Sequence, residues 1–120
     1  MIHHVVLGVS ELERSGSFYD ALLAPLGWRR HYDQEGMVGW GIAKPVFFIA
    51  AQAGTTAGSG LISFSAPGIA AVKAAWDGGT RAGGAGVSGP GEVKRPGSGS
   101  YSAFLADPDG HNIEVTVGAE

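Results

Sequence analysis

The feature that most constrains the fold of this chain is a pattern that occurs twice along it. Each copy begins with an apolar strand, continues into an amphipathic helix that carries an aromatic residue, and ends that helix at a glycine. The copies align at an offset of 57 residues, at which Leu7 falls on Phe64 and Tyr19 falls on Trp76. A repeat of this kind indicates a duplicated supersecondary unit. The 120 residues are therefore predicted to form a single domain of two modules, about 1–53 and about 59–118.

The first copy predicts the order β-α-β-β-β. Apolar residues recur at helical spacing from Leu12 to Leu26, and Ser10 followed by Glu13 matches a capping box that would begin this helix. Period-two alternation and turn-like breaks predict four strands, at Ile2–Val9, Trp28–Asp33, Met37–Ile42 and Val46–Ala51.

The second copy repeats that order less clearly. Strands are predicted at Leu61–Ala66, Tyr101–Ala106 and Asn112–Val117, and Pro67 is expected to open the helix. The stretch Gly78–Ser100 contains many of the 21 glycines of the chain. It therefore predicts a mobile rim loop with one strand, somewhere in Ala85–Val93.

Composition excludes several classes of protein. The chain has no cysteine, which excludes disulfides, cysteine-ligated zinc and a thiol nucleophile. Eight Lys and Arg against eleven Asp and Glu give no basic footprint for nucleic acid. No apolar run is long enough to span a bilayer, and the first residues do not resemble a secretory leader. We therefore expect no nucleic-acid or membrane partner and a cytoplasmic location.

Strand alternation places two functional groups on the faces turned away from the helices. In the first strand Val5 and Leu7 are predicted to pack on the helix, which leaves His4 on the other face. In the last strand Ile113 packs inward, which leaves Glu114 outward. If these faces line a shared hollow, their polar groups need water or a ligand.

Two segments carry a family resemblance. The start, HHVVLGVSELERSGSFYDALLAPLGWR, and the later YSAFLADPDGHNIEV resemble the vicinal-oxygen-chelate superfamily. That group contains glyoxalase I, extradiol dioxygenases, fosfomycin-resistance enzymes and bleomycin-resistance proteins. The resemblance implies an α+β fold, in which two tandem β-α-β-β-β modules form a cupped mixed sheet with the helices outside.

The resemblance also implies a metal site, of which this sequence keeps only part. His4 matches the ligand of the first strand and Glu114 that of the last strand, whereas the usual histidine of the fifth strand is replaced by Leu61. The fourth strand offers no ligand side chain. A divalent metal (Zn, Ni, Mn or Fe) is therefore expected to be weakly held or absent, with His111, Tyr101 or a partner chain as sources of a third ligand.

Each candidate has a structural alternative. His4 could be a cavity residue hydrogen-bonded to Glu114, and Glu114 could pair with Lys94 or Arg95 instead of acting as a general base. Tyr101 could orient a substrate oxygen or be an edge-strand aromatic.

An aromatic wall for a planar ligand is a further hypothesis. Trp40, Phe48 and Tyr32 could form it, and core packing is the alternative for each of them.

Together these features predict a glyoxalase-like or dioxygenase-like protein. It would be a metal-dependent lyase, isomerase or oxygenase acting on a small vicinal-oxygen compound, with His4 and Glu114 as metal ligands and with Glu114 and Tyr101 as catalytic residues. The alternative is a non-catalytic drug-binding protein of the bleomycin-resistance type. A homodimer is the expected assembly.

Overall fold

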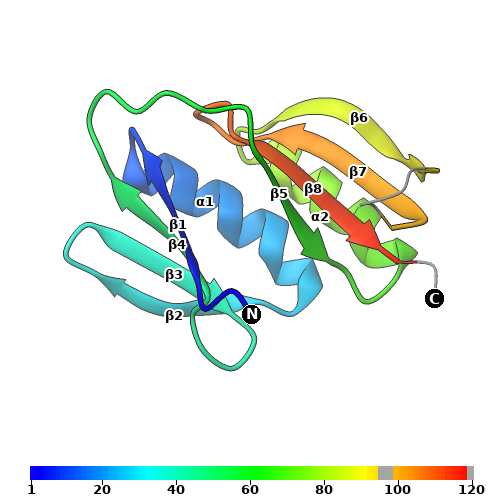
Figure 1. The fold of residues 1–120 in the computed structure, drawn as a ribbon, viewed down its shortest axis with the longest axis horizontal. Coiled ribbons are helices and arrows are strands. Elements are labelled where there is room, and N and C mark those ends of the chain that lie inside the picture. The colour runs from blue at the N-terminus through cyan, green and yellow to red at the C-terminus, as the bar shows by residue number, and fades with distance from the viewer. Residues whose placement is uncertain (95–98, 119–120) are drawn as a thin grey trace.

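The computed structural model describes residues 1–94 and 99–118, and its elements follow the predicted order (Figure 1). The first half contains β1 (Val5–Val9), α1 (Leu12–Leu23), a 3₁₀ turn (Ala24–Leu26), β2 (Arg29–Gln34), β3 (Met37–Gly41) and β4 (Phe47–Ala51). The second half contains β5 (Leu61–Ser65), α2 (Ile69–Arg81), β6 (Ala85–Glu92), β7 (Tyr101–Ala106) and β8 (Asn112–Val117).

The strands form two four-stranded mixed sheets with the same topology. Sheet A has the order β1-β4-β3-β2 and sheet B has the order β5-β8-β7-β6. In each sheet the first and last strands of the half pair in parallel, and the other pairings are antiparallel. This arrangement confirms the predicted α+β fold with two β-α-β-β-β modules. Strands β1 and β5 are each an edge of their own sheet, so each has one side that no other described strand pairs with.

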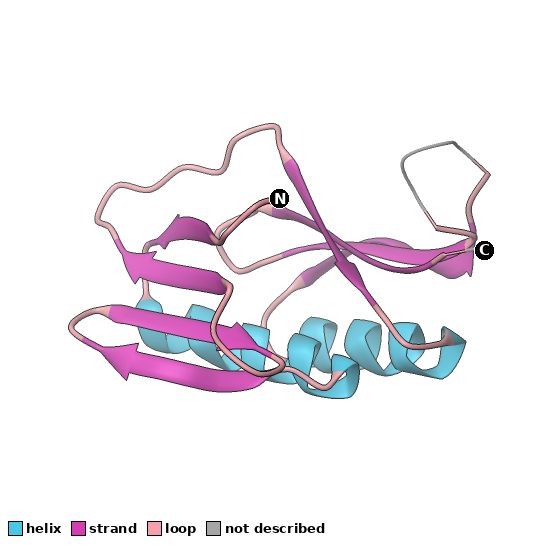
Figure 2. Cartoon of the chain, turned by 60° about the horizontal axis from the view of Figure 1, so that its bottom comes forward, coloured by secondary structure: helices cyan, strands magenta, loops and turns pink. Residues whose placement is uncertain are grey.

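Both helices lie on one side of the two sheets (Figure 2). They pack closely, since a Cβ on Gly78 of α2 would lie 2.5 Å from the carbonyl oxygen of Ala21 in α1. The core fills the space between the helices and the sheet faces turned toward them, which we call the inner faces. Its largest fully buried side chains include Trp40, Tyr19, Phe18, Leu22, Leu23, Ile49, Leu105 and Ile113. Among the described residues, neither helix is long and apolar enough to cross a membrane.

The glycine-rich stretch is more regular than its sequence predicts. Helix α2 continues to Arg81, and β6 is an eight-residue strand paired with β7. Gly86 explains part of the glycine content, because a Cβ there would lie 2.5 Å from the ring of Trp76. A glycine of β6 thus makes room for a helix side chain. The single strand predicted within Ala85–Val93 is confirmed by β6, whereas the predicted rim loop is wrong for residues 78–81, which belong to α2. Residues 95–98 lie outside the described residues.

The predicted capping box at the start of α1 is also wrong. The residue that precedes the helix is Glu11, which makes no side-chain capping bond. Ser10 instead bonds across to the β7–β8 turn: its N–H donates to Asp109 at 3.0 Å and its hydroxyl donates to the same carboxylate. An ionised acceptor forms stronger hydrogen bonds than a neutral one, which favours this long-range partner over a local one.

The β7–β8 turn fastens the second module to the first through three side chains. Asp107 accepts the hydroxyl of Tyr19 at 2.6 Å, Asp109 takes the bonds from Ser10, and the Nε2 atom of His111 lies 2.9 Å from the carbonyl oxygen of Gly8. Asp107 also accepts the backbone N–H groups of Asp109 and His111, a pattern typical of an aspartate that begins a turn. We call Asp107, Asp109 and His111 the turn clamp.

Asp109 makes the turn clamp sensitive to acid. Burial acts to raise the pKa of Asp109, but the hydrogen bonds from Ser10 and the nearby charges of Arg14 and His111 outweigh it, so the pKa lies below its ordinary value. A depressed pKa in the folded state stabilises the protein above the unfolded pKa of about 4, and this contribution is lost as the pH falls through the folded pKa.

We therefore expect Ser10→Ala to lose less stability than the wild type between about pH 5 and pH 2. The measurement is urea unfolding at a series of pH values, with Ser17→Ala on the exposed side of α1 as the matched control. An equal loss of unfolding free energy in the wild type and in Ser10→Ala between about pH 5 and pH 2 would contradict this explanation of the turn clamp.

Candidate functional site

Glu114 carries a buried carboxyl group that has no hydrogen-bond partner in the described part of the chain. It lies on β8 with its side chain on the outer face of sheet B, opposite Ser63 of β5 and Phe104 of β7. The residue is 0% exposed, and neither carboxyl oxygen has a hydrogen-bond partner among the described residues. The next outward-facing pair of β7 and β8 does have an internal hydrogen bond, since the hydroxyl of Ser102 donates to that of Thr116 at 2.6 Å. Buried polar groups are almost always hydrogen-bonded, so Glu114 marks a place where a bound molecule could supply the partner.

Of the two alternative partners predicted for Glu114, only Lys94 lies among the described residues. Lys94 is exposed and no ion pair joins it to Glu114 among the described residues, while Arg95 lies outside them. Ser63, which sequence reasoning did not single out, is the polar neighbour across the ladder. Its outward position was available from the alternation of Ile62 and Phe64, which pack inward.

His4 lies beside the other sheet, sheet A, and is exposed. It precedes β1, its Nδ1 atom is 2.9 Å from that of His3, and its ring meets Phe48 edge-on at 5.6 Å. The predicted hydrogen bond between His4 and Glu114 is therefore wrong, since neither oxygen of Glu114 has a partner in the described chain. The link between the two is indirect: His4 and Ser63 line one small cavity of about 190 Å³, which Glu114 does not reach.

The donors of one chain do not fit a metal ion. The described residues contain no group of three or more His, Cys, Asp or Glu placed to hold one. Leu61, where the resemblance implies a histidine, is 48% exposed and pairs with Asn112. A tightly held ion needs about three or more converging protein ligands, and the described part of the chain offers no such group.

Tyr101 lies on the face opposite to Glu114. It pairs with Val117 at the start of β7 and packs partly buried against the core, whereas Phe104 of the same strand pairs with Glu114. Successive strand residues point to opposite faces of a sheet. Tyr101 and Phe104 are three positions apart, so they lie on opposite faces, and Glu114 shares the face of Phe104. The structure does not bring Tyr101 and Glu114 together.

The three aromatic residues of the predicted wall are divided between two faces. Trp40 is 1% exposed on the inner face of sheet A, where its Nε1–H donates to Asp20 at 3.0 Å. Phe48 and Tyr32 lie on the outer face, with ring centres 5.9 Å apart. Core packing thus holds for Trp40, and the other two remain available to a ligand.

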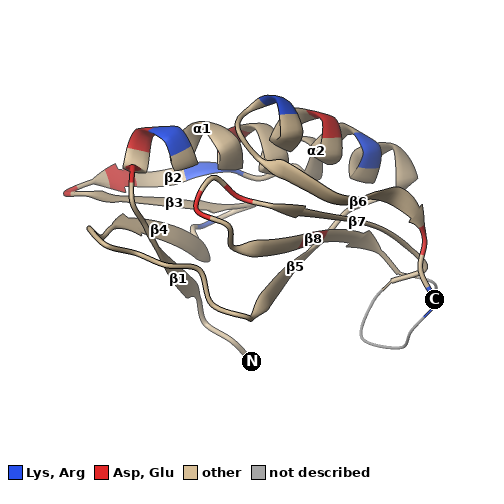
Figure 3. Ribbon diagram, turned by 90° about the horizontal axis from the view of Figure 1, so that it is seen from above, with Lys and Arg blue, Asp and Glu red and all other residues tan. Residues whose placement is uncertain are grey.

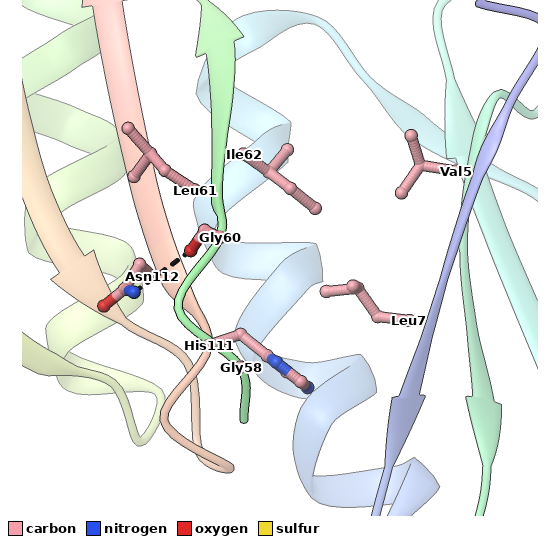
Figure 4. A pocket seen from close by; sticks show the side chains of 8 residues that line it. All are labelled: Val5, Leu7, Gly58, Gly60, Leu61, Ile62, His111 and Asn112. Carbon is pink, nitrogen blue, oxygen red and sulfur yellow. Dashed lines mark hydrogen bonds between the residues drawn. The ribbon is translucent and has the colours of Figure 1, made fainter. Parts of the chain in front are cut away.

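A further cavity, of about 380 Å³, lies between the edge strands β1 and β5 (Figure 4). Val5 and Leu7 from β1 point toward Ile62 of β5 across it. His111 and Asn112 supply its polar lining, but His111 is engaged with Gly8 and the Asn112 amide donates to Gly60 at 3.0 Å. The gap between the two open edges is therefore mainly apolar.

The family model described as the Glyoxalase/Bleomycin resistance protein/Dioxygenase superfamily matches residues 1–115. The chain belongs to this superfamily. The match confirms the resemblance drawn from the first and last strands. A search of curated proteins found no match for this superfamily member.

Solved structures of superfamily members share the fold. A glyoxalase/bleomycin resistance protein from Albidiferax ferrireducens is 28% identical with a TM-score of 0.83, and the match covers 97% of each chain. A glyoxalase-related enzyme from Fulvimarina pelagi is 21% identical with a TM-score of 0.73, covering 96% of this chain and 86% of the other. The fosfomycin resistance protein FosX from Listeria monocytogenes, in a complex with Mn(II) and 1S,2S-dihydroxypropylphosphonic acid, is 19% identical with a TM-score of 0.71, covering 99% and 90%. The last two likenesses show the fold alone.

Proposed function

We propose that this superfamily member is a metal-independent binding protein for a small organic molecule, which Glu114 recognises. The observation that carries the proposal is the buried carboxyl group on an outer sheet face, whose two oxygens have no partner within residues 1–94 and 99–118. A ligand N–H or O–H group would supply the missing hydrogen bonds and would recover the desolvation cost of the carboxyl.

The placement of the donors supports binding without a metal. His4 is on sheet A and exposed, Glu114 is on sheet B and fully buried, and Leu61 occupies the third ligand position. A carboxyl group on its own still suffices for hydrogen-bond recognition of an organic ligand.

A second candidate is the metal-dependent enzyme, with its site divided between two copies of the chain. The edges of β1 and β5 are open, and His4 and Glu114 lie on outer faces at or next to these edge strands. A homodimer that joined those edges would bring His4 of one copy toward Glu114 of the other. Such a dimer is an expectation that sedimentation would test.

The two candidates differ in their response to metal. We expect a thermal-shift screen of aromatic and glycopeptide drugs to give hits that raise the melting temperature in the presence of EDTA, by ligand linkage. The same hits should give no shift with Glu114→Gln and an unchanged shift with the matched surface variant Glu13→Gln. Zn(II), Ni(II) and Mn(II) in air, and Fe(II) without oxygen, should each leave the melting temperature unchanged.

Two results would overturn the binding proposal. One is a screen without EDTA-resistant hits. The other is a metal-induced rise that disappears in His4→Ala, which would favour the shared-metal enzyme instead.

A further inference from the structure

The outer face of sheet A carries a cavity of its own, of about 480 Å³. Its eight lining residues come from the segment before β1 and from all four strands or their loops: His3, His4, Val6, Tyr32, Met37, Lys44, Pro45 and Phe48. Aromatic and other apolar side chains make up most of this set. We call these residues the sheet A pocket.

Two glycines shape the pocket. A Cβ on Gly39 would lie 2.6 Å from Phe48, so the missing side chain lets the phenyl ring lie against the sheet. A Cβ on Gly41 would lie 1.7 Å from the carbonyl oxygen of Lys44, so this glycine lets the β3–β4 loop fold back over the strand. The first glycine gives the pocket its aromatic floor, and the second places Lys44 at its rim.

The rings around this floor are arranged for contact with another ring. Phe48 meets His4 edge-on at 5.6 Å and Tyr32 at 5.9 Å. Met37 and Pro45 add flat or polarizable apolar surface. Aromatic side chains spaced in this way favour a planar aromatic guest, which gains from edge-to-face and offset contacts beyond area burial.

The charge of the lining selects among such guests. Lys44 is exposed, no ion pair engages it among the described residues, and no carboxylate belongs to the lining. Charged residues gather instead over the two helices and at the ends of strands (Figure 3). An anionic group on the ligand would therefore meet one lysine and two imidazoles and no opposing charge.

We infer that the sheet A pocket binds a planar aromatic carboxylate, with the ring on Phe48 and Tyr32 and the anionic group at Lys44. This inference goes beyond the proposed function, because it uses residues of the other sheet and does not require Glu114. The competing occupant is a second copy of the chain, which would cover the same face.

The test uses three probes that differ only in charge: 2-naphthoate, 2-naphthylmethanol and (2-naphthylmethyl)ammonium. Calorimetric titration of the wild type should give the tightest binding for 2-naphthoate and the weakest for the ammonium. An exposed ion pair changes affinity by roughly two- to fivefold. Lys44→Glu removes the ion pair with 2-naphthoate and creates one with the ammonium probe, so this variant should reverse the order. Lys73→Glu, the same change on exposed helix α2, should leave the order as in the wild type.

The aromatic part of the inference is tested separately. Phe48→Leu should weaken all three probes by roughly tenfold without changing their order, since ring contacts are lost and the charge is kept. Circular dichroism melting of each variant would verify folding.

Three results would overturn the inference. The first is an order of affinities that Lys44→Glu leaves unchanged. The second is an affinity that Phe48→Leu leaves unchanged. The third is a combination of results: the wild type binds none of the probes and sediments as a dimer, and the Lys44→Glu variant sediments as a monomer. A second copy of the chain would then cover the face. None of these results bears on the EDTA-resistant hits that depend on Glu114, so the two proposals fail independently.

Discussion

Asp107→Ala is expected to lower the free energy of unfolding by about 3–5 kcal/mol, more than any other single change in the turn clamp. Asp107 is 3% exposed and accepts three hydrogen bonds, from the hydroxyl of Tyr19 and from the N–H groups of Asp109 and His111. The change removes all three and leaves the hydroxyl of Tyr19 buried without a partner. Urea unfolding at neutral pH measures the loss.

Tyr19→Phe separates the two parts of that loss. It removes one hydrogen bond and leaves both bonds within the turn, so we expect a cost of about 1–2 kcal/mol. Burial, followed by the charge and hydrogen bond of Asp107, raises the pKa of Tyr19 well above its ordinary value, so the hydroxyl remains a donor at neutral pH. Equal costs for Tyr19→Phe and Asp107→Ala would mean that the bonds within the turn contribute nothing.

Glu114→Leu is expected to stabilise the protein by about 1–3 kcal/mol and to abolish the EDTA-resistant ligand shift. The carboxyl group is buried without a hydrogen bond among the described residues, and an apolar side chain of similar size removes that cost. A gain in stability combined with a loss of binding is the signature of a residue retained for a ligand. Thermal melting with and without a drug hit measures both effects.

The matched control for this change is Glu13→Leu on the exposed surface of α1, which should change neither quantity by much. A destabilised Glu114→Leu variant would show that the carboxyl is satisfied in the free protein. The proposed role of Glu114 would then lose the observation that carries it.

Strand alternation explains why much of the fold could be predicted. Strands β7 and β8 have the predicted bounds, Tyr101–Ala106 and Asn112–Val117, because apolar Ile113, Val115 and Val117 alternate with polar residues along β8 and a tight turn separates the two strands. The β6 strand lies within the predicted Ala85–Val93, but its many glycines leave it with little period-two alternation of side chains. Its register is set instead by pairing with β7 and by the space that Trp76 needs.

The candidate site was predicted less well than the fold. Alternation correctly assigns His4 and Glu114 to outer faces, but it says nothing of the distance between two sheets. It also missed that Tyr101 is out of phase with Glu114, and that Ser10 reaches Asp109 rather than its own helix. Contacts between residues so far apart in the chain depend on how the modules pack, which no local pattern encodes.

The separation of the two sheet faces has a consequence for how such a protein can change. Packing against the helices and the turn clamp stabilises the inward layer of the molecule, whereas some outward side chains, such as Val6 and Leu61, are about half exposed. Leu61, half exposed on that outward layer, stands where relatives of the superfamily are expected to carry a histidine. Substitutions at such exposed positions can therefore add or remove ligand-binding side chains with little loss of folding stability. The same fold can then bind different ligands after few substitutions.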